Sequence, residues 1–90
     1  MDLEIIRQNI DQIDSDLVRL LEERMGLVSQ VVAFKKANGK AVLDSKREEV
    51  IFKKVAERVE DKQYEEAIVA TFADILKQSR AFQEKQLKQS

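Results

Sequence analysis

Residues 3–37 carry one uninterrupted helical pattern, and this pattern constrains the fold more than any other feature of the sequence. Apolar residues recur along it at alternating spacings of three and four, which place them on one side of a helix. Asn38 and Gly39 follow, and glycine readily adopts the left-handed conformation that ends a helix. Such a helix is about 50 Å long, whereas a compact chain of this size measures about 30 Å across. The helix therefore extends beyond its own domain, and its apolar stripe predicts a homodimer with entwined long helices.

Three cationic side chains occupy positions of this stripe where apolar residues are expected. Arg24 lies near the middle of the stripe, and Arg7 and Lys35 lie near its two ends. A buried cation without a partner costs several kcal/mol, so the pattern predicts an anionic partner. Arg24 and Lys35 are about 16 Å apart along the helix axis and can reach one small ligand, but Arg7 lies about 25 Å from Arg24. If Arg7 serves the same pocket, it comes from the partner chain.

The rest of the sequence predicts two more helices, and so an all-α chain of three helices in one domain, residues 1–90. Proline is absent and only two glycines occur, which favours helix throughout. A second helix is expected to begin after Asp44 or Ser45 and to run to about residue 60. Ser45 and Glu48 fit a capping box. The third helix is expected over residues 64–88.

Polar residues also interrupt the apolar face of the third helix, where Ser79 and Gln83 continue the line at helical spacing. Together with the cations of the first helix, they predict a pocket of positive charges and neutral donors, which suits a small polyanion. Two alternatives stay open at this point. Asp14 and Glu48 could neutralise the cations, and a lone polar residue such as Arg24 can simply fix the register or oligomeric state of paired helices.

Composition excludes several classes of function. Lys and Arg total 16 against 17 Asp and Glu, and this balance argues against nucleic-acid binding, which usually needs a basic domain. The absence of His and Cys removes the usual general base, the commonest metal ligands and disulfides. No apolar run approaches the ~20 residues that cross a bilayer, and the acidic N-terminus has no signal-peptide core. We expect a cytoplasmic protein without a metal and without a membrane or nucleic-acid partner.

The polar positions and several apolar residues near them form an ordered set of short motifs. In sequence order the set reads Arg7, Ile10-Asp11-x-Ile13-Asp14, Leu20-Leu21-x-x-Arg24, Val31 with Lys35, Asp44-x-x-Arg47-Glu48 and Ser79-Arg80-x-x-Gln83. Each piece alone is unspecific, but together they resemble the all-helical class of chorismate mutases over residues 3–83. Two positions depart from the family pattern: Ala41 stands where many members have proline, and Arg80 where some have an apolar residue near the substrate.

The resemblance implies an entwined homodimer that rearranges chorismate to prephenate, with no nucleophile and no cofactor. It implies that Lys35 and Gln83 donate to the ether oxygen of the substrate in the transition state. Arg24, and Arg7 from the other chain, would hold the two carboxylates of the substrate, with Ser79 assisting one of them. We expect a monofunctional enzyme, because 90 residues leave no room for a fused catalytic domain.

The same resemblance implies the surroundings of the substrate ring. Glu48 and the backbone of Asp44 would bind the ring hydroxyl, Arg47 would support them, and Val31 and Ile51 would flank the ring. Two other functions remain open: an isochorismate-pyruvate lyase on the same scaffold, and a non-catalytic helical dimerisation module. Assays with both substrates separate the two enzymes, and apolar replacement of the cations separates either enzyme from the module.

Overall fold

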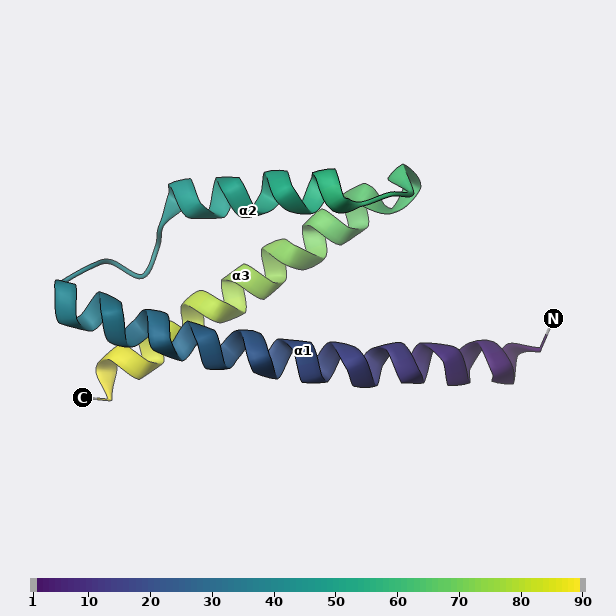
Figure 1. Cartoon of the computed structure of the whole chain (residues 1–90), viewed down its shortest axis with the longest axis horizontal. Coiled ribbons are helices and arrows are strands. Elements are labelled where there is room, and N and C mark those ends of the chain that lie inside the picture. The colour runs from purple at the N-terminus through teal and green to yellow at the C-terminus, as the bar shows by residue number, and fades with distance from the viewer. Residues whose placement is uncertain (1, 90) are drawn as a thin grey trace.

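The computed structural model describes residues 2–89, which form three α-helices and no strand (Figure 1). Helix α1 spans Leu3–Asn38, α2 spans Ser45–Arg58 and α3 spans Glu65–Lys88, with a short 3-10 helix, η1, at Lys62–Tyr64. The predicted all-α class is confirmed, as is the long N-terminal helix. Within the described residues, no helix is both long and apolar enough to cross a membrane.

Both ends of α1 are capped by the residues next to it. The side chain of Asp2 accepts a hydrogen bond from the backbone N–H of Glu4 at 2.9 Å, which satisfies a donor that the first helical turn leaves free. At the other end, Gly39 has a φ of 63°, and its N–H donates to the carbonyl oxygen of Lys35. The helix therefore ends at Asn38 because the next residue can adopt the left-handed conformation without strain.

The start of α2 differs from the expected capping box. Asp44 is the N-cap, and its side chain accepts a hydrogen bond from the N–H of Arg47 at 3.0 Å. Ser45 is the first residue of the helix, and Glu48 turns toward α3, where it pairs with Arg80. Of the two residues expected to cap the helix, Asp44 is confirmed. The prediction of a box between Ser45 and Glu48 was wrong, because the carboxylate of Asp44 already caps the helix and Glu48 has a charged partner elsewhere.

Helix α3 holds the chain together, since it packs against both α2 and α1. Figure 1 shows it running diagonally from the end of α2 to the C-terminal half of α1. The buried apolar residues are Val28, Val32, Val42, Val55 and Leu76. Among residues 2–89 no side chain falls below 2% exposure. One chain alone therefore has only a thin core.

The N-terminal half of α1 is largely exposed, and its first turns extend past the other helices (Figure 1). The molecule measures 54 × 25 × 15 Å, and its radius of gyration is 16.2 Å, compared with about 12 Å for a compact chain of this length. The large apolar side chains exposed along this half are Leu3, Ile5, Ile6, Ile10, Ile13, Leu17, Val18, Leu20 and Leu21. The apolar stripe predicted from the sequence is thus present, and the rest of the described chain leaves most of its N-terminal half exposed.

Candidate functional site

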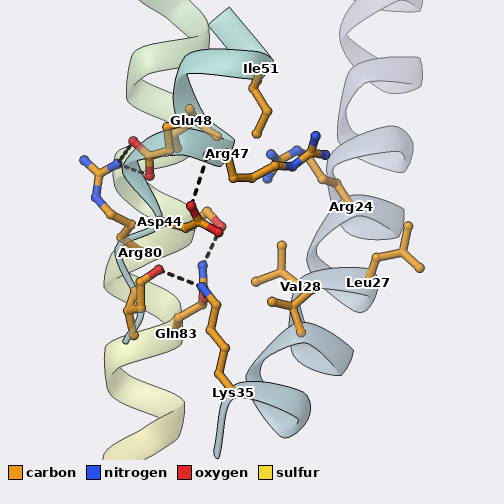
Figure 2. A pocket seen from close by; sticks show the side chains of 14 residues that line it. Arg24, Leu27, Val28, Lys35, Asp44, Arg47, Glu48, Ile51, Arg80 and Gln83 are labelled. Atoms are coloured by element: carbon orange, nitrogen blue, oxygen red, sulfur yellow. Dashed lines mark hydrogen bonds and ion pairs between the residues drawn. The ribbon is translucent and has the colours of Figure 1, made fainter. Parts of the chain in front are cut away.

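A pocket of about 270 Å³ lies between the C-terminal half of α1, the start of α2 and the C-terminal half of α3 (Figure 2). Its polar lining consists of Arg24, Lys35, Asp44, Arg47, Glu48, Ser79, Arg80 and Gln83. Val31 and Ile51 belong to its apolar lining. The pocket therefore brings together every site residue predicted from the sequence except Arg7, and it adds Arg80.

Lys35 and Gln83 are held against each other at one end of this pocket. Lys35 Nζ donates to the carbonyl oxygen of Val42 at 2.6 Å and to Gln83 Oε1 at 3.0 Å. Gln83 Nε2 donates to Ser79 Oγ at 3.2 Å, and both of these α3 residues are buried. An ammonium has three N–H donors and an amide has two, so each group keeps one donor after these bonds. Two spare donors, one charged and one neutral, thus sit at neighbouring positions.

Arg24 has an unsatisfied donor in the pocket wall. Its Nη1 atom is buried and has no hydrogen-bond partner within the described residues. An unpaired buried donor costs about 1–3 kcal/mol, and more when it is charged. Neither carboxylate that could have neutralised the cation does so, because Glu48 pairs with Arg80 and Asp14 takes part in no ion pair found among residues 2–89. This donor indicates an acceptor supplied from outside the chain.

Glu48 and Arg80 form an ion pair across α2 and α3. Both carboxylate oxygens of Glu48 accept from Arg80 Nη1, each at 2.6 Å. From the sequence, Arg80 stood out only as a departure from a family pattern and was not predicted to belong to the site. Its position three residues before Gln83 places it near the same face of α3, and this spacing is the signal that could have identified it.

The charges of the pocket are unbalanced. Four cationic and two acidic side chains line it, which gives the lining a formal charge of +2. Asp44 is partly occupied by its capping bond, and Glu48 by Arg80. The remaining positive charge and the spare donors suit a small molecule with two carboxylates, which such groups bind through charge-assisted hydrogen bonds.

Arg7 is not part of this pocket within one chain. It lies exposed on the N-terminal half of α1, 17 residues before Arg24 on the same continuous helix, a separation of about 25 Å along the axis. Its predicted contribution across a dimer interface is therefore not tested by a single chain.

The fold and the pocket together define an all-helical protein with a positively charged pocket between its three helices. The chain belongs to the chorismate mutase type II family, whose model matches residues 6–84. It is also similar to a chorismate mutase of Methanocaldococcus jannaschii, with 27% identity over 86 residues that cover 94% of this chain and 87% of the relative. No solved structure matches the chain significantly. The resemblance drawn from the sequence motifs is confirmed at the level of the family.

Proposed function

We propose that the pocket between α1, α2 and α3 is the active site of a chorismate mutase, which rearranges chorismate to prephenate. Membership of the family and the similarity to a chorismate mutase support this activity. The single observation that supports this position of the site is the unpaired Nη1 of Arg24. Arg24 lines the same pocket as Lys35 and Gln83. The substrate has two carboxylates, and the lining charge of +2 complements them.

The chemistry is a [3,3] shift in which one C–O bond breaks while one C–C bond forms. As the C–O bond breaks, negative charge develops on the ether oxygen. The spare donors of Lys35 and Gln83 are assigned to this oxygen. Since Lys35 is already fixed by Val42 and Gln83, the ammonium needs little reorganisation during the reaction, and its bond to the oxygen strengthens only as the charge appears.

The cations select the reactive shape of the substrate. Arg24 binds one carboxylate through its free donor, and Arg7 of the partner subunit binds the other. The hydroxyl of Ser79 accepts from Gln83, so its own hydrogen remains available to a carboxylate. Holding both carboxylates at fixed positions folds the substrate so that its reacting ends meet, which is an orientation effect on the rate.

Other residues of the pocket lining are assigned to the ring. Glu48 and the backbone of Asp44 are assigned to the ring hydroxyl, and Arg47 supports them from the first turn of α2. Val31 and Ile51 line the pocket and are assigned to the faces of the ring. Only apolar contacts are required there, because the ring carbons carry no charge.

A homodimer completes the site in this proposal. An apolar groove of about 360 Å³ lies between α1 and α3, and Leu17, Leu21, Phe72 and Arg24 are among the residues that line it. The exposed stripe of a second copy of α1 matches this groove in character. Because Arg24 borders both the groove and the pocket, a helix in the groove can bring Arg7 of the partner subunit to the substrate.

The direct test is to mix the purified protein with chorismate and follow the loss of its ultraviolet absorbance and the formation of prephenate. We expect turnover well above the uncatalysed rate. A parallel assay with isochorismate, with release of pyruvate as the readout, tests the lyase alternative. Absence of turnover in both assays would leave the non-catalytic dimerisation module as the function of this fold. A cytoplasmic location and the lack of a cofactor stay predictions.

A further inference from the structure

Glu48 and Arg80 form an ion pair in the lining of the pocket, and the proposed chemistry gives Arg80 no role. Figure 2 shows the two side chains meeting beside the cavity, Glu48 from α2 and Arg80 from α3. The side chain of Glu48 is 19% exposed and that of Arg80 is 33% exposed. Charges at such partly buried positions interact more strongly than charges on an open surface.

An unpaired Glu48 would oppose the binding of a dianion. Its carboxylate lies in the wall of the pocket, where it would repel the carboxylates of the substrate. It would also compete with them for the free donor of Arg24 and for the guanidinium of Arg47. Like charge beside a binding site costs affinity, and the loss of one partner of a charge pair leaves the other uncompensated.

We infer that Arg80 is a positioning residue that neutralises Glu48 and holds its carboxylate on the α3 side of the pocket, so that a dicarboxylate substrate can bind next to it. This inference rests on the proposed function. Arg80 does not touch the reacting atoms in this scheme. It acts through Glu48, and it raises the net charge of the lining from +1 to +2.

The geometry leaves Glu48 able to bind the ring hydroxyl while it is neutralised. A carboxylate has about four lone-pair positions on its two oxygens, and Arg80 Nη1 occupies one on each oxygen. The other positions remain available to a hydroxyl donor from the ligand. The ion pair therefore neutralises Glu48 and also fixes its carboxylate as an acceptor for the ring hydroxyl.

The first experiment compares KM and kcat of the wild type with those of Arg80→Ala and Arg80→Lys. In Arg80→Ala we expect KM for chorismate to rise roughly tenfold while kcat changes much less, because a ground-state charge effect acts on binding. Arg80→Lys restores a positive charge and should recover most of the loss, and it remains informative if the alanine variant does not fold. Lys77→Ala is the matched control, since it removes an exposed cation of the same helix away from the pocket.

The second experiment separates this role from a structural one. In a Glu48→Gln background there is no charge to neutralise, so Arg80→Ala should change KM by less than about twofold. Unfolding temperatures of all variants are measured in parallel. An unchanged KM in Arg80→Ala, or an equal rise in both backgrounds, would overturn the inference. A wild type that neither turns over chorismate nor binds prephenate by calorimetry would instead overturn the proposed function, and the inference with it.

Discussion

At the scale of single residues, the site depends on donors that are fixed before any ligand arrives. Lys35 shows this most clearly, because one ammonium tethers the loop at Val42, contacts Gln83 and still keeps a free N–H. Gln83 shares its two amide donors in the same way between Ser79 and the pocket. Because Lys35 also donates to Val42, the conformation of the loop between α1 and α2 helps to fix the donor assigned to the ether oxygen.

Replacing Lys35 with alanine should remove one of the two donors that face the developing charge. The expected loss in kcat is about 10²- to 10³-fold, the usual effect of one such donor. Lys36→Ala is the control, because Lys36 is exposed in the same last turn of α1. Steady-state kinetics on variants shown to be folded by circular dichroism check the prediction, and an unchanged kcat would reject the assigned role.

Replacing Gln83 with glutamate should make the rate depend on pH. An amide donates at every pH, whereas a carboxyl group donates only when it is protonated. The wild-type kcat should stay nearly flat between about pH 5 and 9, while that of Gln83→Glu should be low at alkaline pH and rise toward acid. Gln78→Glu, an exposed site on the same helix, is the control. A flat profile in Gln83→Glu would contradict the donor role.

The polar site residues could be predicted because helical periodicity fixes which residues share a face. Ser79 and Gln83 are one turn apart and so share a face of α3, and both are buried on that face. The pair between Glu48 and Arg80 could not be predicted in this way. A local capping rule explains Glu48 equally well from sequence, and only the packing of α2 on α3 decides which partner it takes.

At the scale of elements, the helix ends decide where the site residues fall. Asp44 caps the N-terminus of α2 and so fixes where the helix that carries Arg47 and Glu48 begins. The long helix and its glycine end were predictable, since the signals are local. The 3-10 helix at Lys62–Tyr64 was not, because its Asp61 cap and the polar residues after it fit an ordinary loop equally well.

The corrected cap of α2 gives a stability prediction. Asp44→Ala should lower the free energy of unfolding by about 1 kcal/mol, because the N–H of Arg47 loses its acceptor. Ser45→Ala should cost less, since Asp44 and not Ser45 accepts the capping bond. Urea unfolding at one protein concentration measures both. If Ser45→Ala lowered the free energy of unfolding more than Asp44→Ala, the result would support a capping box between Ser45 and Glu48 instead.

At the scale of the whole molecule, the length of α1 is the feature that one chain does not explain. The sequence predicted that this helix extends past its domain, and the exposed stripe agrees with that prediction. The sequence could not identify the surface that covers the stripe, because matching two apolar faces needs their relative positions in space. In the proposed dimer, the groove beside Arg24 is the surface that covers the stripe of the partner subunit.

Subunit exchange tests whether the pocket is shared between chains. Arg7→Ala and Arg24→Ala should each have little activity alone. After the two variants are mixed and exchanged, the activity should recover to about a quarter of the wild-type value, because half of the random pairs are hybrids and each hybrid has one intact pocket of two. Each variant carried through the same exchange alone is the control. If both residues acted within one chain, no recovery would occur.

The uncovered half of α1 also links abundance to activity. In the proposed dimer, a lone subunit has neither a protected stripe nor a full set of cations, so separation of the pair removes stability and turnover together. Dilution then inactivates this protein by separating its subunits, as denaturant inactivates a monomeric enzyme by unfolding it. Specific activity should fall below a threshold concentration, and the amount of protein in the cell becomes a determinant of how well each copy works.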